Sequence, residues 1–92
     1  MKLEVKFSNR FDKDLKLAKK RNKNLDNLFI VVEKLASLEK LDDKYHDHAL
    51  LGEYKGLREC HIEPDWLLIY YIENQTLTLV LSRLGSHSDL FG

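Results

Sequence analysis

The stretch WLLIYYI at residues 66–72 decides the fold. It is a run of apolar and aromatic side chains without a charge. Such a short run, bounded by turn residues, is typical of a central strand covered on both faces. Glu63-Pro64-Asp65 precedes the run and Glu73-Asn74-Gln75 follows it. Because proline presets the first corner of a turn and Asp tolerates the second, the chain is expected to enter this strand through a tight turn.

Two further strands are predicted on either side of this run. Residues 54–62 alternate in polarity, which is the pattern of a strand with one buried face. The alternation gives the strand two faces: Cys60 and Ile62 on one, Glu59 and His61 on the other. Residues 76–84 form the last strand, which ends at Gly85 and is followed by a short tail. Strands joined by tight turns predict a mostly antiparallel sheet.

The first half of the chain predicts one strand and two helices. Residues 2–7 alternate polar and apolar side chains. Ser8 or Asn9 can cap a first helix, and Asn24 a second one that ends near residues 38–40. Each helix has an apolar face: Phe7, Phe11, Leu15 and Ala18 in the first, and Leu25, Leu28, Phe29, Val32, Leu35 and Ala36 in the second. Helices joined by so few residues are expected to pack as an antiparallel hairpin.

The predicted order is β-α-α-β-β-β, an α+β domain over residues 1–92 with an antiparallel sheet packed on a two-helix hairpin. Residues 41–53 have no clean period and are expected to form a polar loop that re-enters the core at Leu50 and Leu51. A chain this short hides only about 60–68% of its unfolded surface. Part of the other sheet face should therefore stay in water, and function is expected there.

Composition excludes several classes of protein. With 43% hydrophobic and 33% charged residues, the chain is neither disordered nor a membrane protein. No apolar run is long enough to span a bilayer, and the N-terminus has no apolar region of a signal peptide. The single cysteine, Cys60, excludes an internal disulfide and fits the reducing cytoplasm.

The net charge of zero conceals two unequal halves. Residues 1–50 hold 12 basic and 9 acidic residues, whereas residues 51–92 hold 3 basic and 6 acidic ones. The basic excess is concentrated in one short segment: Arg10, Lys13, Lys16, Lys19, Lys20, Arg21 and Lys23. Such a local stripe can bind a polyanion, and the alternative is a solvated helix face.

All four histidines lie in the second half: His46, His48, His61 and His87. With Asp65 and Arg83 near one end of the predicted sheet, they suit two kinds of chemistry. The first is metal binding, for which His46-Asp47-His48 and His61 offer nitrogen and oxygen ligands. The second is cleavage of an RNA phosphodiester, which needs a base, an acid and a cation but no metal or other cofactor. The alternative is a set of separate surface groups.

Three stretches carry a resemblance to a known family. They follow the pattern D-H-x-L-x-G, then R-x-x-H-x-x-P-D-W-x-L-x-Y, then R-x-G-S-H-x-x-L-F, at residues 47–52, 58–70 and 83–91. With Phe11-Asp12-Lys13-Asp14-Leu15 at the start of the first helix, the chain resembles the YafQ group of the RelE/ParE toxin superfamily from end to end. The resemblance implies the RelE-like fold.

It also implies a type II toxin. Such toxins are endoribonucleases that enter the A site of the 70S ribosome and cut the translated mRNA without a metal. A cognate DinJ-like antitoxin neutralises the toxin, and the complex binds operator DNA to repress its own operon. These expectations place the protein in the cytoplasm with no membrane partner.

The resemblance carries over six site residues: His48, His61, Asp65, Arg83, His87 and Phe91. His87 is the expected general acid, delivered by a flexible tail. His48 or His61 is the expected base, with Asp65 fixing its tautomer or taking the proton itself. Arg83 would stabilise the phosphorane, and Phe91 would stack on a codon base.

RNA contacts are expected from two further groups. Trp66 either stacks on a base or anchors the central strand. The basic segment is expected to grip ribosomal RNA through Lys13, Lys16, Lys19, Lys20, Arg21 and Lys23, an interaction that salt weakens. Ala49 departs from the family pattern, which has proline after His48, and this departure loosens the loop that holds the histidine.

Two other classes remain open from the sequence. One is a toxin of the same fold that is not a nuclease, as in ParE-type gyrase inhibitors. The other is a nucleic-acid-binding module without catalysis. The combination of His48, His61, Asp65 and His87 argues against the inhibitor, because binding alone gives no reason for it.

Overall fold

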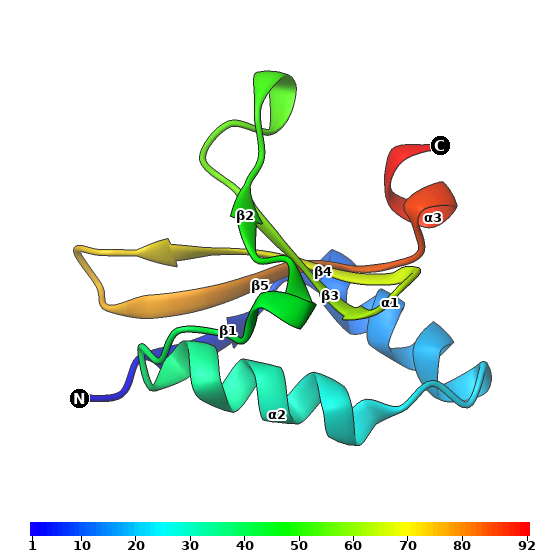
Figure 1. Cartoon of the computed structure of the whole chain (residues 1–92), viewed down its shortest axis with the longest axis horizontal. Helices are drawn as coiled ribbons and strands as arrows, with labels where there is room; N and C mark the ends of the chain where they lie inside the picture. The colour runs from blue at the N-terminus through cyan, green and yellow to red at the C-terminus, as the bar shows by residue number, and fades with distance from the viewer.

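The computed structural model describes residues 1–92 and contains three helices and a five-stranded sheet (Figure 1). The elements follow the chain as β1 (Glu4–Phe7), α1 (Asn9–Lys20), α2 (Leu25–Ala36), β2 (His48–Ala49), β3 (Arg58–Glu63), β4 (Trp66–Glu73), β5 (Thr78–Gly85) and α3 (His87–Phe91). Two single-turn 3₁₀ helices flank β2: η1 (Asp43–Tyr45) and η2 (Gly52–Tyr54). No helix has the length and apolarity that crossing a membrane requires.

The strand order in the sheet is β1-β5-β4-β3-β2, so the apolar strand β4 is central, as predicted. Neighbouring strands are antiparallel except β1, which runs parallel to β5. The sheet is therefore mixed. Sequence periodicity predicts that residues 2–7 form a strand, but it does not reveal which strand is its neighbour.

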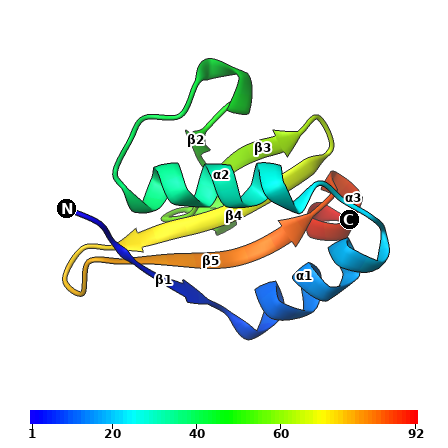
Figure 2. The same ribbon diagram turned by 90° about the horizontal axis from the view of Figure 1, so that it is seen from below.

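Both long helices lie on one face of the sheet, α1 against β5 and α2 against β3 (Figures 1 and 2). The core between the layers includes large, fully buried side chains: Phe11, Leu28, Leu68, Tyr70, Leu79 and Leu81. Ser8 caps α1 by accepting from the Phe11 N–H at 3.0 Å. Its hydroxyl also donates to the Ser82 carbonyl at 2.7 Å, which ties the start of α1 to β5. Asn24 caps α2, as predicted.

Four local predictions are wrong. Phe29 is 46% exposed, and Val31 is buried in its place. Residues 28–32 are all apolar, so the pattern does not single out one face of α2. Leu51 is 82% exposed, because the chain turns outward at η2 instead of re-entering the core. The strand expected from residue 54 begins at Arg58, and the tail after Gly85 is the helix α3.

Candidate functional site

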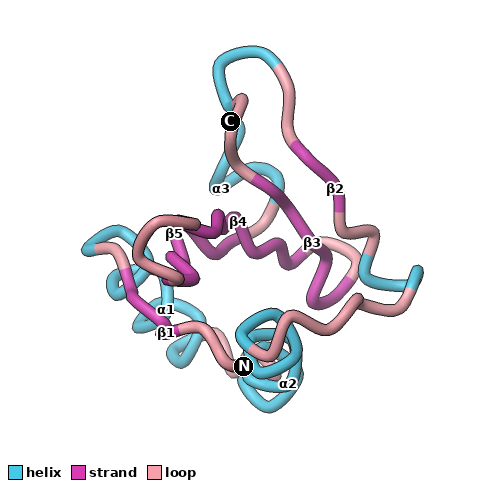
Figure 3. The backbone as a smooth tube through the Cα atoms, turned by 90° about the vertical axis from the view of Figure 1, so that its left-hand side faces the viewer, coloured by secondary structure: helices cyan, strands magenta, loops and turns pink.

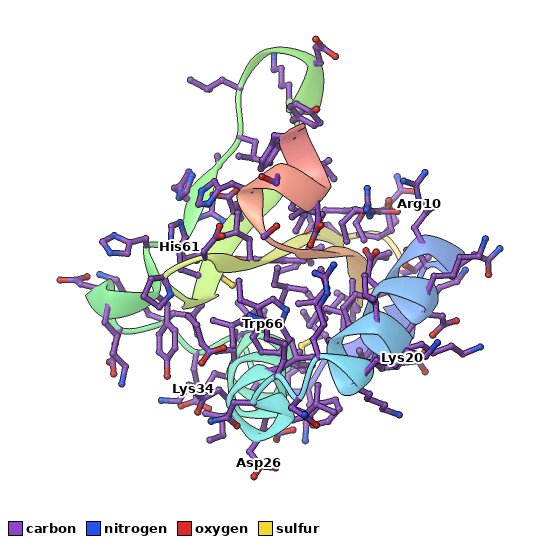
Figure 4. The ribbon with its side chains drawn as sticks, turned by 90° about the vertical axis from the view of Figure 1, so that its right-hand side faces the viewer. Arg10, Lys20, Asp26, Lys34, His61 and Trp66 are labelled. Carbon is purple, nitrogen blue, oxygen red and sulfur yellow. The ribbon has the colours of Figure 1, made fainter.

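The sheet face opposite α1 and α2 holds the histidines. The segment from β2 to β3, which contains η2, rises from this face, and α3 rises beside it (Figures 1 and 3). On β3, Glu59 and His61 point away from the core that contains Cys60 and Ile62, as the alternation predicts. Figure 4 shows His61 on the α3 side of the sheet and Trp66 on the α2 side.

Glu59 lies at the centre of this face. Its carboxylate Oε1 is 3.5 Å from Nε2 of His48 and 3.5 Å from Nε2 of His61. The Glu59 side chain is only 7% exposed, whereas that of His48 is 49% exposed. A buried carboxylate between two imidazoles orients both rings. The alternation of residues 54–62 predicts that Glu59 lies beside His61, but no predicted role marks Glu59 as a site residue.

The tautomer of His48 follows from its other nitrogen. Nδ1 lies 2.6 Å from the carbonyl oxygen of His46, which can only accept a hydrogen bond. Nδ1 therefore carries a proton, and Nε2 is the atom that faces Glu59. His46 has φ +48°, in the left-handed region that non-glycine residues rarely adopt. Its ring lies 5.2 Å from that of His61, and the His48 ring lies 6.5 Å from the same ring, so His46 and His48 both lie near His61.

Asp65 is paired with His87. Its Oδ1 accepts from the His87 imidazole Nδ1 at 2.7 Å and from the His87 backbone N–H at 3.0 Å. The backbone N–H and the imidazole hold the pKa of Asp65 below its usual range. The resemblance implies that Asp65 assists His48 or His61. Instead, the carboxylate fixes His87 with Nδ1 protonated, which leaves Nε2 free to exchange a proton.

The segment that carries His87 is an ordered helix and not a flexible tail. Ser86 and Asp89 form a capping box at its start, and the Ser86 N–H lowers the pKa of Asp89. The Asp89 carboxylate also pairs with Arg21, just after α1, at 3.1 Å. At the other end of α3, the Phe91 ring packs edge-on against Tyr54 at 5.3 Å and stays 39% exposed. Both ends of α3 are thus attached to neighbouring segments.

His87 completes the histidine group. Its ring lies 5.8 Å from that of His61 in an edge-on arrangement. One ligand atom each from Glu59, His61 and His87 lies within 4.8 Å of the other two. These metal-ligand atoms differ from the predicted set of His46-Asp47-His48 and His61. Asp47 cannot take part, because it bonds to Tyr70 on the opposite face of the sheet.

Arg83 lies at one edge of this face. Arg83 on β5 pairs with Ile69 on β4, and Ile69 pairs with Glu59 on β3. The backbones of Arg83 and Glu59 are therefore two strand spacings apart, roughly 10 Å. Asp14 of α1 holds the guanidinium, accepting from Nε at 2.8 Å and from Nη2 at 3.4 Å. Asp14 also accepts from the Leu84 N–H at 2.9 Å. The Nη1 donors remain for a phosphate. Asp14 was not predicted, because it lies 69 residues from Arg83 in the sequence.

Trp66 is not an RNA-stacking residue in this structure. Its side chain is 2% exposed and belongs to the core, so the interpretation as a strand anchor is the correct one.

Five of the six predicted basic contacts are exposed: Lys13, Lys16, Lys19, Lys20 and Arg21, while Lys23 is half-buried. Figure 4 shows Arg10 and Lys20 on the outer side of α1. The end of this basic segment reaches the site, because a cavity of about 440 Å³ is lined by Arg21, Lys23 and Asp65 among others.

Known proteins are similar to this chain in sequence and in fold. A family model described as a bacterial toxin of type II toxin–antitoxin systems, YafQ, matches residues 3–92. The chain belongs to the YafQ family. The resemblance found in the sequence is thereby confirmed, and so is the α+β fold.

Similar proteins match almost the whole chain. The mRNA interferase toxin YafQ of Escherichia coli K12 is 38% identical over 97% of this chain and 96% of its own. A metal-bound toxin from Helicobacter pylori is 50% identical, with a TM-score of 0.92, over 97% of this chain and 99% of that one. One chain in the structure of the E. coli DinJ–YafQ toxin–antitoxin complex is 38% identical, with a TM-score of 0.89, over 100% of this chain and 100% of that one.

Proposed function

We propose that this protein is an mRNA interferase, a toxin that cuts translated mRNA in the ribosomal A site and is neutralised by a DinJ-like antitoxin. The observation that carries the proposal is the pair of carboxylate–imidazole contacts, Asp65–His87 and Glu59–His61, on one exposed sheet face. The E. coli relative is named an mRNA interferase, and its complex with DinJ supports the antitoxin as partner. Binding of operator DNA by such a complex belongs to the same proposal.

RNA supplies its own nucleophile, the 2′-hydroxyl, so the protein needs to move two protons. His61 or His48, beside Glu59, takes the proton of the 2′-hydroxyl as general base. His87 gives a proton to the departing 5′-oxygen from Nε2, while Asp65 holds Nδ1. The centroids of the His61 and His87 rings lie 5.8 Å apart, so both imidazoles can approach the same phosphodiester, one at the 2′-hydroxyl and the other at the 5′-oxygen.

The remaining site residues act on charge and on the base. Arg83 donates from Nη1 to the phosphate and stabilises its extra negative charge in the transition state. Phe91, held by Tyr54, offers an exposed ring face on which a codon base can stack. The basic residues of α1 hold the ribosomal RNA.

Replacing His87 tests the proposal. We expect His87→Ala to lower mRNA cleavage about 10²- to 10⁴-fold, the usual contribution of a general acid. Ends of mRNA are mapped in cells that express the variant, the parent protein, or Ser88→Ala as an exposed control in the same helix. Cleavage by His87→Ala at the parent level contradicts the acid role. Growth arrest without new mRNA ends, together with inhibition of DNA supercoiling, indicates a gyrase inhibitor instead.

The same residues support a second candidate function, binding of a transition metal. Glu59, His61 and His87 offer the nitrogen and oxygen ligands that Zn²⁺ and Cu²⁺ accept, and the H. pylori relative is metal-bound. A metal held there would occupy the imidazoles that move protons, so it would inhibit cleavage. We expect Zn²⁺ to bind by calorimetry, Glu59→Gln to weaken binding at least 10-fold, and a chelator to restore cleavage. Full cleavage at saturating Zn²⁺ contradicts this function.

A further inference from the structure

Three residues of the family pattern have no place in the proposed chemistry: Asp47, Arg58 and Tyr70. They come together on the sheet face opposite the histidines. The Tyr70 hydroxyl donates to Asp47 Oδ1 at 2.5 Å. Arg58 Nε lies 3.4 Å from the same oxygen and 3.3 Å from the Tyr70 hydroxyl. We call this group the Asp47–Arg58–Tyr70 cluster.

The cluster is attached to the centre of the sheet. Tyr70 is on the central strand β4, 1% exposed, directly opposite Arg58 on β3. Asp47 lies just before β2, and its side chain is 24% exposed. Burial and the hydrogen bond to Asp47 raise the pKa of Tyr70, so the hydroxyl stays a donor at neutral pH. The cluster therefore joins the loop before β2 to the core.

Strand β2 needs such an attachment, because it has only two residues. Within it, His48 pairs with Glu59 and Ala49 with Arg58. Successive residues of a strand face opposite sides, so a shift of one residue would turn His48 away from Glu59 and bring Asp47 to the site. Two paired residues and Ala49, in place of a stiffer proline, do little to prevent that shift.

We propose that the Asp47–Arg58–Tyr70 cluster is a positioning device that fixes the register of β2 and thereby holds His48 against Glu59. Asp47 accepts hydrogen bonds from Tyr70 and Arg58 on the core face of the sheet. Because successive residues of a strand face opposite sides, these bonds place His48 on the other face, beside Glu59. The consequence for catalysis rests on the proposed function, whereas the position of His48 does not.

Two variants test the cluster, and each removes a different partner of the Tyr70–Asp47 hydrogen bond. Tyr70→Phe removes only the hydroxyl, and Asp47→Ala removes the acceptor. Each should lower the kcat of mRNA cleavage by about 10- to 100-fold with little change in KM, as expected for misplacing a group by about 1 Å. The double variant should be only slightly worse than Asp47→Ala alone, because both single changes remove the Tyr70–Asp47 hydrogen bond and only the 3.3 Å contact between Arg58 and Tyr70 is lost in addition. Tyr71→Phe, the neighbouring tyrosine on the opposite face of β4, is the matched control.

Histidine ring signals in ¹H–¹⁵N spectra give a readout that does not depend on activity. In both variants we expect the His48 signals to shift or broaden, while those of His87 stay as in the parent protein. Unchanged His48 signals in folded Tyr70→Phe and Asp47→Ala overturn the proposal. So does an equal change at all four histidines that follows a fall in Tm, since that shows a general loss of structure. If the parent protein cuts no mRNA, the spectra still decide the position of His48.

Discussion

At the scale of single residues, carboxylates organise the site. Glu59 lies between two imidazoles, Asp65 fixes a third, and Asp14 holds the guanidinium of Arg83. Each acidic side chain has a specific basic partner. Specific pairs of this kind, and not the overall charge, set the orientation of the groups proposed to move protons and bind phosphate.

Asp14→Asn tests one of these pairs. The carboxylate accepts from Arg83 and from the Leu84 N–H, and its side chain is 15% exposed. Since hydrogen bonds to charged groups contribute about 1.5–3 kcal/mol, we expect the free energy of unfolding to fall by about that amount. Urea denaturation measures the change, with exposed Glu39→Gln as control. A fall no larger than in the control would show that Asp14 does not hold Arg83.

At the scale of elements, sequence patterns predict strands better than they predict contacts. The alternation of residues 58–63 and the apolar run of 66–72 are local properties, so β3, β4 and the outward direction of Glu59 and His61 follow from them. The partner of Asp65 does not, because His87 is 22 residues away and arrives there only through α3. The capping signal Ser86-x-x-Asp89 was nevertheless present, and it would have predicted a helix where a tail was expected.

The attachment of α3 should depend on pH. Backbone N–H groups lower the pKa of Asp65 and Asp89 in the folded protein. A carboxyl group with a lowered pKa contributes stability above its unfolded pKa of about 3.9 and loses that contribution as the pH falls through the lowered value. Protection of the Leu90 N–H from hydrogen exchange should therefore persist at pH 5 and fall below about pH 4.

Asp89→Asn provides the comparison. Its Leu90 N–H should already be poorly protected at pH 7, whereas the amides of β4 should exchange as in the parent protein. Loss of protection near pH 6 in the parent protein would mean that a group other than these two carboxylates attaches α3.

At the scale of the whole molecule, the neutral chain divides its charges between two surfaces. The lysines of α1 are free and exposed, whereas Asp14, Glu59 and Asp65 at the site are paired. A polyanion approaching from the α1 side therefore meets a basic surface that ends at Arg21 and Lys23, next to Asp65. Net charge could not predict this arrangement, because it depends on which charges are paired after folding.

Neutralising this surface tests its role. Lys16→Gln with Lys20→Gln should weaken ribosome binding and make it less sensitive to salt, by roughly one unit of slope for each lysine that binds a phosphate in the parent protein. Sedimentation with ribosomes at several salt concentrations measures the slope. Lys34→Gln with Lys40→Gln changes the net charge equally on α2 and just after it, and should leave the slope unchanged. Equal effects of both pairs would indicate a general response to charge.

The parallel pairing of β1 with β5 also constrains how the protein can be made. Glu4 pairs with Thr78, so the first strand has no neighbour until the fifth has been synthesised, and His87 follows only after that. Contacts so distant in the chain form late in folding. A nascent chain that has reached β4 therefore has an open sheet and lacks His87 and Arg83. The chain can therefore become toxic only after its last elements, β5 and α3, have been synthesised. An inhibitor that is already present at that time can bind the protein as soon as it folds.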